Sequence, residues 1–317
     1  MISVIIPNWN GQAHLPTCLG ALRRQTHPDF EVLVVDNAST DASCQMVLDD
    51  YPEVRLVTLP TNRGLTGGVN VGINEARGET VALLNNDTEA HPYWLAALQQ
   101  ALDEHPEAGS IASKMMLFDR RDVIHSAGDY YRRDGIPGNR GVWEEDRGQY
   151  DEPGWVFGGC GGAVAYRKAM LDEIGLLDED LFMYCEDVDL AWRAQLAGYP
   201  CWYQPSAVIY HRLSATGGGP LSSYYTGRNT VLVWLKNTPG PLLQRDWPLA
   251  LRAQMRIAAE ALRSWRGAAA RARLRGQVAG LALALPWLGK RRQVQASRRV
   301  SLDYIASILS PVPPAGS

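Results

Sequence analysis

Side chains that could bind a metal ion, a nucleotide and a proton follow three apolar runs of the sequence. The runs are residues 32–35, 83–84 and 182–185, and the side chains after them are Asp36, then Asn85, Asn86 and Asp87, and then Glu186 and Asp187. Open α/β sheets bind their ligands at the carboxyl ends of the strands. Since each run has the composition of a strand, we expect these side chains to meet in one pocket.

The tripeptide Asn85-Asn86-Asp87 has the spacing of an Asp-x-Asp metal motif, with asparagine in the first place. Mg²⁺ and Mn²⁺ take oxygen ligands and neutralise charge that grows on a departing diphosphate. We therefore expect Asp87 to bind Mg²⁺ or Mn²⁺, with Asn85 offering a carbonyl oxygen or a ribose contact. An ordinary Asn/Asp turn is the alternative. His211 follows an apolar run, so it is expected to contact the metal or the diphosphate, although a lone histidine is more often structural.

Two segments suit a nucleotide. The Asp36 carboxylate could accept a hydrogen bond from the imide N–H of uracil or thymine, whereas Ser39 or Asp41 nearby could instead cap a helix. Residues 62–70 are rich in glycine and are expected to form a flexible loop after the third strand, in which Arg63 could bind phosphate through its charge and its forked geometry. The Gly-x-Gly-x-x-Gly fingerprint is absent, which argues against a Rossmann dehydrogenase.

Glu186 and Asp187 are the expected proton acceptors. Either carboxylate could take the proton from an attacking hydroxyl, which is general base catalysis. Acids in the first turn of a helix also offset its dipole, and that structural role is the alternative. Upstream, the small residues 158–162 would leave room for a sugar, with Gly159 among them.

The bulk composition is that of a globular protein. The chain has 317 residues, of which 46% are hydrophobic, enough for a full core. Its five cysteines contain no Cys-x-x-Cys pair, which argues against a zinc site or a disulfide framework and favours the reducing cytoplasm. No basic segment followed by a long apolar stretch occurs at the N-terminus, so no signal peptide is expected.

The charge divides the chain into two parts. Residues 245–300 hold 13 Lys or Arg against two acids, whereas residues 1–244 hold 18 Lys or Arg against 31 acids. Blocks this different usually belong to different structural units. We expect a catalytic α/β domain in residues 1–230 and a basic helical region in residues 231–317. The longest apolar stretch of that region, residues 278–289, is too short to span a bilayer, which takes about 20 residues.

Short apolar runs alternate with helical periods over residues 1–110, which predicts a mostly parallel α/β sheet. The expected strands are residues 2–6, 31–35, 54–59, 80–84, 161–166, 202–203 and 207–210, and the expected helices are residues 69–76, 93–102, 168–174 and 187–197. Another helix is expected after the first strand, because Leu15, Cys18, Leu19 and Leu22 share one helical face. Residues 114–155 show no clear period and predict loops with a small hairpin.

The order of these segments resembles that of the inverting family-2 glycosyltransferases of the GT-A fold. The resemblance rests on residues 4–7, 35–41, 62–64, 85–87, 186–189 and His211, and it extends over residues 1–230. The local sequence around Asp36, Asn62 and Asn85 is similar to that of rhamnosyltransferase-like bacterial members, which build cell-surface polysaccharides.

The resemblance implies transfer of a sugar from a nucleoside diphosphate donor, with inversion, to a hydroxyl of a glycan or a lipid-linked saccharide. It favours dTDP-rhamnose as donor, with a UDP-sugar as the alternative. It implies that Pro7, Asp36 and Arg63 contact the nucleotide, that Asp87 binds the metal and that Asp187 is the base. Asn85 departs from the pattern, since many relatives have aspartate there.

Other classes fit less well. A processive polysaccharide synthase is disfavoured, because no spanning helix and no Gln-x-x-Arg-Trp motif occur. A sugar-nucleotide pyrophosphorylase would carry a basic glycine-rich loop after its first strand, and residues 8–11 are not one. A catalytically silent nucleotide-sugar binder or scaffold of the same fold stays open.

The basic helical region suits a membrane surface. Arginines alternate with Leu, Ile and Trp over residues 251–275, and such helices bind anionic membranes, where residues 281–288 could enter the interface. The alternative is a helical pair packed on the catalytic domain with a solvated basic face. Nucleic acid is not expected as a partner, because the catalytic half is acidic and lacks a recognised binding motif. We expect a cytoplasmic protein, peripheral at the inner face of the membrane.

Overall fold

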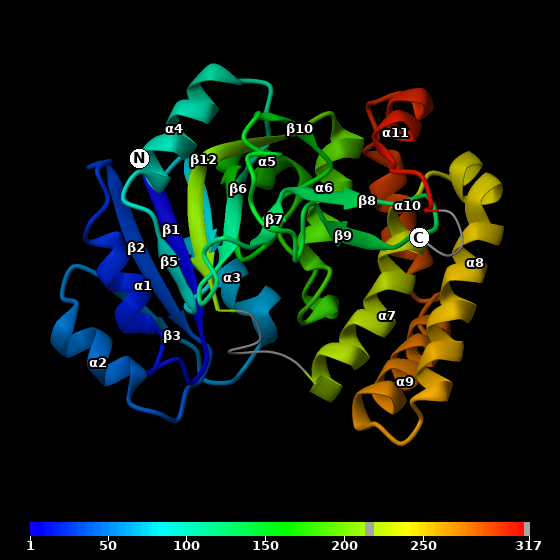
Figure 1. The fold of residues 1–317 in the computed structure, drawn as a ribbon, viewed down its shortest axis with the longest axis horizontal. Helices are drawn as coiled ribbons and strands as arrows, with labels where there is room; N and C mark the ends of the chain where they lie inside the picture. Colours follow the sequence, from blue (N-terminus) through cyan, green and yellow to red (C-terminus); the bar gives the residue numbers. More distant parts are fainter. Residues whose placement is uncertain (213–218, 314–317) are drawn as a thin grey trace.

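Four parallel strands form the first half of the central sheet. The structure is a computed structural model that describes residues 1–212 and 219–313. The strands lie in the order β3-β2-β1-β4 and are β1 (Ile2–Asn8), β2 (Phe30–Asp36), β3 (Arg55–Thr58) and β4 (Thr80–Leu84). They are joined by α1 (Leu15–Leu22), α2 (Ser43–Asp50) and α3 (Gly64–Glu75) (Figure 1). Because neighbouring strands are parallel, their carboxyl ends meet at one edge.

The second half of the sheet is mixed. β11 (Ala163–Arg167) runs antiparallel between β4 and β6 (Ser110–Leu117), and β12 (Cys201–His211) lies parallel to β6. The smaller strands are β5 (Thr88–Ala90), which pairs with β12, β7 (Ile124–Ala127), which pairs with β6, and β10 (Gly154–Val156) at the edge. β8 (Asp129–Tyr131) and β9 (Pro137–Asn139) form a separate hairpin. The predicted mostly parallel α/β sheet and the predicted small hairpin are both confirmed.

Two strands differ from the prediction. β6 extends into a stretch predicted as loop from residue 114, and its side chains are buried on both faces, so the polar alternation of a half-exposed strand is missing. Residues 202–203 and 207–210 belong to the single strand β12, whose register shifts between Gln204 and Val208. Pro205 lies at this shift and has no N–H to donate to the ladder.

Two further predictions were wrong for tertiary reasons. The glycine-rich segment 62–70 is not a loop, because α3 begins at Gly64. A side chain would not fit at Gly72, where a Cβ would lie 2.4 Å from Cγ2 of Ile5, so close packing on the sheet outweighs the low helix propensity of glycine. Residues 182–185 do not form a strand. Phe182, Tyr184 and Cys185 have positive φ angles and make a tight turn before the next helix.

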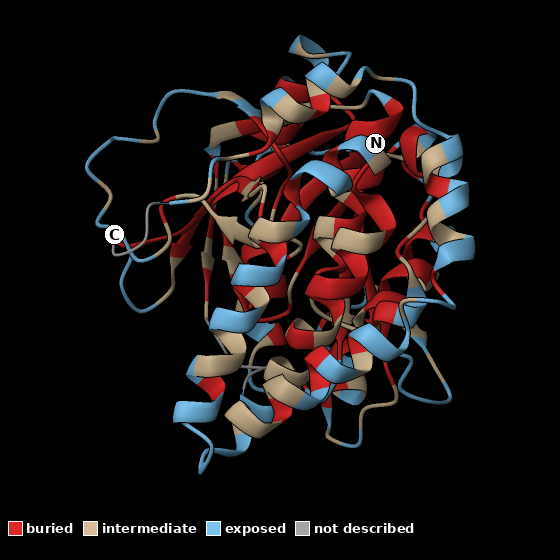
Figure 2. Ribbon diagram, turned by 90° about the vertical axis from the view of Figure 1, so that its right-hand side faces the viewer, coloured by how far each residue is buried: buried red, intermediate tan, exposed pale blue. Residues whose placement is uncertain are grey.

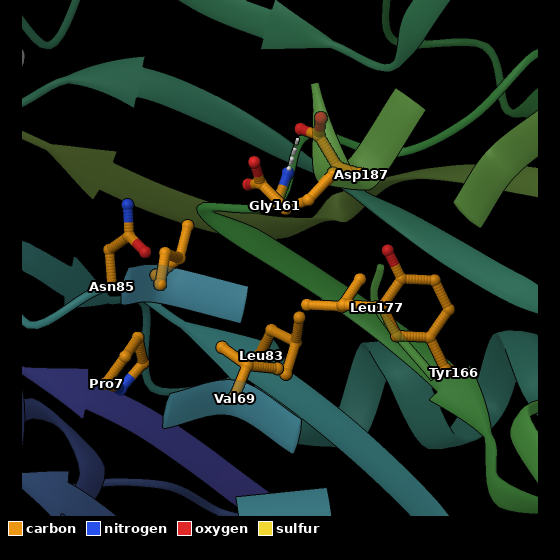
Figure 3. Close-up of a pocket in the computed structure, with 10 residues that line it drawn as sticks. Pro7, Val69, Leu83, Asn85, Gly161, Tyr166, Leu177 and Asp187 are labelled. Carbon is orange, nitrogen blue, oxygen red and sulfur yellow. Dashed lines mark hydrogen bonds between the residues drawn. The ribbon is translucent and has the colours of Figure 1, made fainter. Parts of the chain in front are cut away.

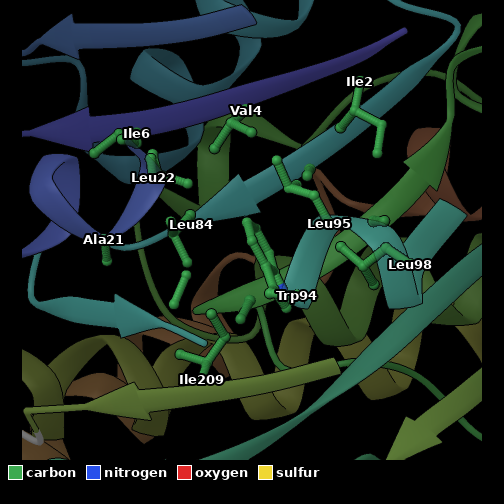
Figure 4. Packing of buried hydrophobic residues seen from close by; sticks show 14 of the residues in the cluster. Ile2, Val4, Ile6, Ala21, Leu22, Leu84, Trp94, Leu95, Leu98 and Ile209 are labelled. Carbon is green, nitrogen blue, oxygen red and sulfur yellow. The ribbon is translucent and has the colours of Figure 1, made fainter. Parts of the chain in front are cut away.

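Helices cover both faces of the sheet. On one face β1 and β4 pack against α1 and α4 (Trp94–Glu104), through a cluster that includes Ile2, Val4, Ile6, Leu84, Leu95 and Leu98 (Figure 4). The predicted face of α1 is confirmed, since Leu15, Cys18, Leu19 and Leu22 are all buried. The opposite face packs against α3, α5 (Lys168–Ile174) and α6 (Glu186–Ala197). Figure 2 shows the strands buried between helices whose outer turns are exposed.

The C-terminal part is helical, as predicted. It consists of α7 (Gly219–Asn237), α8 (Gly240–Arg263), α9 (Ala268–Ala282), α10 (Leu288–Ala296) and α11 (Leu302–Ile308). Trp192 and Leu196 of α6 pack with Leu232 and Val233 of α7 in one buried cluster. α7 continues across residue 230, so the predicted boundary falls inside one helix. In the described parts of the chain no helix is both long and apolar enough to cross a membrane.

Candidate active site

A small pocket lies at the carboxyl edge of the sheet, beside the start of α6 (Figure 3). Its polar lining comes from Asn85, Gly161, Glu186 and Asp187, and Pro7 of β1 also borders it. Apolar side chains form the remaining wall: Leu65, Val69, Leu83, Tyr166 and Leu177. The structure therefore brings Pro7, Asn85, Glu186 and Asp187 together, as the sequence predicted.

Asp187 is held by backbone donors. The N–H of Gly161 donates to Oδ2 at 2.8 Å, and the N–H of Val188 donates to Oδ1 at 2.7 Å. Burial raises the pKa of Asp187, and these backbone hydrogen bonds act in the opposite direction. Because a carboxylate oxygen has two lone pairs, each oxygen can still accept a proton or a further hydrogen bond. Donors that stabilise the charged form make this carboxyl the better candidate for an ionised base.

Glu186 is in a different environment. It is buried, and its Oε2 has no hydrogen-bond partner in the described part of the chain. Burial, followed by the charge of Asp187, raises the pKa of Glu186 to about 8. Two neighbouring carboxyl groups are difficult to ionise together in a buried site. The arrangement therefore leaves the proton on Glu186 at neutral pH and the charge on Asp187.

A third acid, Asp129 of β8, belongs to the same electrostatic neighbourhood. Its Oδ1 accepts hydrogen bonds from Ser126 Oγ at 3.2 Å and from Asn139 Nδ2 at 2.8 Å. Burial, followed by the charge of Asp187, raises the pKa of Asp129 well above its ordinary value. Sequence reasoning missed this residue, because it lies in the stretch without a clear period. If protonated, Asp129 would add no negative charge near Asp187.

Asp189, the next acid along α6, is a structural anchor. It is fully buried and bonds to Lys236, Arg193 and Asn237 at distances between 2.8 and 3.0 Å. Burial alone would raise its pKa, but Lys236 and Arg193 bring the pKa down to about 2. With its charge neutralised by two cations, Asp189 has no role as a base.

The turn that presents the two acids is strained and is clamped by α7. Residues with positive φ that are not glycine cost about 1–3 kcal/mol each, and Phe182, Tyr184 and Cys185 are three of them. The amide of the fully buried Asn229 donates to the carbonyls of Leu181, Met183 and Tyr184 at 3.0, 2.9 and 2.7 Å. Arg228 donates to the carbonyls of Asp180 and Leu181, which lie at the same turn. No sequence signal marked Asn229, which is one of two asparagines in α7.

The ends of β1, β2 and β4 are joined by a buried amide network. Asn8 Nδ2 donates to Asp36 Oδ1 at 2.9 Å, and Asn86 Nδ2 donates to Asn8 Oδ1 at 2.9 Å. Asp36 Oδ2 accepts from the N–H of Ser39 at 2.9 Å. Asp36 and Asn86, both expected to lie in the pocket, are thus tied together through Asn8. The sequence could have indicated Asn8, since it too follows an apolar strand.

Arg63 and Gly159, two of the predicted site residues, do not line the pocket. Arg63, the residue before α3, donates to Glu179 at 2.8 and 3.1 Å, with both side chains partly exposed. An exposed pair of this kind is weak, so a phosphate could replace Glu179. Gly159 does not line the pocket. A Cβ there would lie 2.8 Å from Cγ2 of Val164, inside the protein, and Gly161 borders the pocket instead.

Asp87 and His211 lie together, as predicted. Pairing of β12 with β5 sets His211 opposite Thr88, and His211 Nε2 lies 3.1 Å from Asp87 Oδ1. On its other side His211 Nδ1 lies 3.1 Å from Nδ1 of His125, a buried residue of β7 that the sequence did not indicate. Burial, followed by the charge of His211, lowers the pKa of His125 to about 3, so His125 is neutral. The glycine-rich segment after His211 lies largely outside the described residues.

The donor set at this place fits a metal that takes most of its ligands from the substrate. Within residues 1–212 and 219–313, no group of three His, Cys, Asp or Glu side chains is arranged to hold a metal ion. One carboxylate with one imidazole is too little for a closed protein site. Mg²⁺ and Mn²⁺, however, are often bound by one or two carboxylates together with phosphates and water. Asp87 and His211 would supply the protein part of such a site.

Comparison with known proteins gives a family for this chain. Residues 3–175 match the model of Glycosyl transferase family 2. An N-acetylglucosaminyl-diphospho-decaprenol L-rhamnosyltransferase of Mycobacterium tuberculosis is 28% identical over 262 residues. That alignment covers 74% of this chain and 84% of the mycobacterial protein.

Solved structures share the fold. GalNAc-T7, solved with UDP, GalNAc and Mn²⁺, aligns with a TM-score of 0.62 at 18% identity, over 74% of this chain and 48% of that one. The mannosyltransferase PcManGT of Pyrobaculum calidifontis, solved with GDP-Man and Mn²⁺, aligns with a TM-score of 0.56 at 17% identity, over 97% of this chain and 82% of that one. The GT-A fold predicted from the sequence is confirmed by these neighbours.

Proposed function

We propose, for a chain that belongs to glycosyl transferase family 2, that it transfers a sugar from a nucleoside diphosphate donor to a lipid-linked saccharide with inversion. The observation that carries this proposal is the single pocket at the carboxyl edge of the sheet, which joins Pro7 and Asn85 to the buried carboxyl pair Glu186 and Asp187. A nucleotide-facing edge and a proton acceptor in one pocket are what a sugar transfer needs.

The reaction follows from the state of the two acids. Asp187 takes the proton of the acceptor hydroxyl, and that oxygen forms a bond to the anomeric carbon of the donor. The bond from this carbon to the diphosphate oxygen breaks on the opposite face, so the electron pair leaves with the diphosphate and the configuration inverts. Glu186 keeps its proton and therefore lets Asp187 stay ionised beside it.

Asp87 and His211 would hold the metal. When bound there, Mg²⁺ or Mn²⁺ would neutralise the charge that develops on the diphosphate. His211 would use the lone pair of Nε2 for the metal and turn its Nδ1–H toward His125. The low pKa of His125 keeps it neutral and able to accept this hydrogen bond. Such a partner fixes the tautomer and the ring orientation of a metal ligand.

The donor and the acceptor are proposed from the mycobacterial relative. Its printed name specifies rhamnose transfer to N-acetylglucosaminyl-diphospho-decaprenol, and 84% of its length aligns with this chain. The sequence resemblance to rhamnosyltransferase-like members points the same way. We therefore favour dTDP-rhamnose as donor and a polyprenyl diphosphate-linked N-acetylglucosamine as acceptor, in the synthesis of a cell-surface polysaccharide.

A lipid-linked acceptor would give the basic helices a purpose at the membrane. Leu262 and Trp265, at the end of α8 and in the turn after it, are 58% and 56% exposed, and Arg263 and Arg266 lie beside them. Exposed aromatic and aliphatic side chains with arginines suit the surface of an anionic membrane. The enzyme would then act as a peripheral protein at the cytoplasmic leaflet.

A nucleotide-release assay tests the function. dTDP-rhamnose, UDP-GlcNAc, UDP-galactose and GDP-mannose are each incubated with a polyprenyl diphosphate-linked N-acetylglucosamine, and dTDP-rhamnose should give the fastest release. Asp187→Asn should lower kcat by about 10²–10⁴-fold while donor binding is retained, because only the base is lost. Asp172→Asn, at an exposed acid of α5, is the matched control. Donor binding without release from any of the four would indicate a silent binder.

A further inference from the structure

An apolar groove runs between α7, α8 and α9, outside the pocket described above. Its volume is about 480 Å³, within the range of about 300–1,000 Å³ that is usual for small-molecule sites. Its walls are mainly apolar side chains: Val231, Trp234 and Leu235 from α7, Trp247, Leu251, Met255 and Ala258 from α8, and Leu274, Val278 and Leu281 from α9. Among the polar members, Asp134 pairs with Arg132 and Nε2 of Gln277 donates to Gln254, whereas Oε1 of Gln277 is buried and has no hydrogen-bond partner in the described part of the chain.

The groove exists because the three helices pack unequally. α9 lies directly on α7 through glycines: a Cβ at Gly276 would lie 2.1 Å from the carbonyl oxygen of Tyr224, and one at Gly280 would lie 2.8 Å from that of Arg228. Small residues of this kind let two helix backbones approach closely. Residues 241–263 of α8 contain no glycine, and the apolar side chains of this helix line the groove together with those of α7 and α9. Leu251 and Met255 on α8 remain 50% and 59% exposed, and Leu281 on α9 remains 66% exposed.

The lining indicates the chemistry of the occupant. Removing an almost wholly apolar surface from water is favourable, so this surface favours an apolar ligand. Among the described residues that line the groove, Asp134 alone carries a charge, and that charge is already paired. A long hydrocarbon chain fits this lining, whereas a sugar or a nucleotide would leave its hydroxyl groups without partners.

The floor of the groove lies close to the acids of the active site. Thr230 of α7 borders the groove, and its Oγ1 lies 3.9 Å from Sγ of Cys185, the residue before Glu186. Asn229, its neighbour on α7, holds the same turn. One helix thus separates an apolar groove from the proposed base.

A cation lies at this junction. Arg273 of α9 extends over α7 at Gly227, where a Cβ would lie 3.1 Å from its Cδ. Burial raises the pKa of the Cys185 thiol, and the positive charge of Arg273 acts in the opposite direction. Among the described residues Arg273 is half-buried and takes part in no hydrogen bond or ion pair that would neutralise it. Arginine suits phosphate through its fork of donors.

We propose that the groove binds the first isoprene units of a polyprenyl diphosphate acceptor, with Arg273 on the diphosphate. This inference rests on the proposed function, because it assumes a lipid-linked acceptor. An apolar chain, a diphosphate and a sugar hydroxyl follow one another in such a molecule. Three features around α7 match these parts in the same order: the apolar groove for the chain, Arg273 for the diphosphate and Asp187 for the sugar hydroxyl.

The arrangement of the helices agrees with this path. In Figure 1 the turn between α8 and α9 and the start of α7 lie at the lower edge, the side on which β1 ends. β4 runs parallel to β1 and ends on the same side. An acceptor whose sugar enters the pocket from that edge could therefore lay its chain along α7. The excess of positive charge in residues 245–300 complements the anionic head group.

Acceptor esters of graded length test the proposal without a bilayer. N-acetylglucosaminyl diphosphate carrying a methyl, a geranyl or a farnesyl group is used below its micelle concentration. The wild-type enzyme should prefer the farnesyl over the methyl ester at least tenfold in kcat/KM. Leu251→Gln with Leu281→Gln should bring this ratio to within about twofold of one, and Ala258→Trp should do so by filling the groove. Leu48→Gln, at a 60% exposed leucine of α2, is the matched control and should keep the preference.

A binding measurement separates this inference from the proposed function. Farnesyl diphosphate is titrated calorimetrically with no donor present, and it should bind at least tenfold more weakly to Arg273→Gln than to Arg275→Gln, the control at an exposed arginine of the same helix. Binding of farnesyl diphosphate that Arg273→Gln weakens, with no transfer to any ester, would support the groove as a lipid site and count against the proposed function.

Several results would overturn the inference. Transfer to all three esters at equal kcat/KM would mean that the chain is not recognised, although the function would stand. Loss of vesicle binding in the groove variants, together with equal use of the esters, would assign the groove to the bilayer itself. A changed molecular mass of the groove variants in light scattering, together with equal use of the three esters, would assign the groove to a second copy of the chain.

Discussion

Replacing Asn229 by leucine should impair catalysis from a position outside the pocket. The two N–H groups of this buried amide serve three backbone carbonyls in the turn before Glu186 and Asp187. A leucine of similar size would leave the carbonyls of Met183 and Tyr184 without this donor, whereas the carbonyl of Leu181 would keep its hydrogen bond from Arg228. Each buried group left unsatisfied costs about 1–3 kcal/mol, and the turn already carries about 1–3 kcal/mol of strain at each of three residues.

The turn should therefore relax, and the carboxylates should move with it. A displacement of about 1 Å at the reacting groups can cost on the order of 10²-fold in rate. We expect Asn229→Leu to lower kcat about 100-fold, and to lower the free energy of unfolding by roughly 2–4 kcal/mol because the carbonyls lose their donor. Donor affinity should change less than twofold, because Pro7, Asn85 and Asp36 lie on other elements.

The assay measures kcat, donor affinity by calorimetry and the thermal midpoint for each variant. Gln195→Leu is the matched control, because this buried amide of α6 also donates to two backbone carbonyls, those of Val156 and Phe157, outside the turn before Glu186 and Asp187. It should lose stability to a similar extent and keep its kcat within about twofold. An equal loss of stability in both variants with unchanged kcat in Asn229→Leu would refute the positioning role.

Three further predictions concern the acids, the metal and the membrane. Burial raises the pKa of Glu186 to about 8, so as pH rises above about 4.5 the unfolded chain releases this proton first and folding stability falls until about pH 8. Glu186→Gln should remove this fall in stability, which urea unfolding at pH 5 and pH 8 would measure. An equal fall in the free energy of unfolding for the variant and the wild type would contradict this expectation. EDTA should abolish transfer and Mn²⁺ should restore it, and His125→Phe should weaken Mn²⁺ binding about 10–100-fold in a calorimetric titration with the donor nucleotide. Binding like that of the wild type would exclude His125 as a support for His211. Arg263→Glu with Arg266→Glu should reduce co-sedimentation with anionic vesicles, since each arginine near the surface adds about 1 kcal/mol. Salt-insensitive binding equal to the wild type would reject a membrane role for this turn.

The local pattern determined the first half of the protein. Apolar runs bounded by polar residues placed β1, β2 and β4 within one or two residues, and β4 matches residues 80–84 as predicted. The helical period of its apolar residues predicted α1, and the helix predicted over residues 168–174 matches α5. These elements could be predicted because their signals lie within one segment. The polar residues that follow the strands, from Asp36 to Asp87, could be found for the same reason, since parallel strands bring their ends together.

What the tertiary structure decided depends on contacts between distant segments. The glycine-rich segment 62–70 was expected to be a loop, but α3 begins at Gly64, and this helix packs closely on the sheet at Gly72. Asn229 lies 45 residues after Tyr184, whose carbonyl it holds, and His125 lies 86 residues before His211. No local period marks such residues, because their role is set by a partner far along the chain. The acids Glu186 and Asp187 illustrate both levels: their presence was visible in the sequence, while burial and the donors around them decided which one keeps its proton.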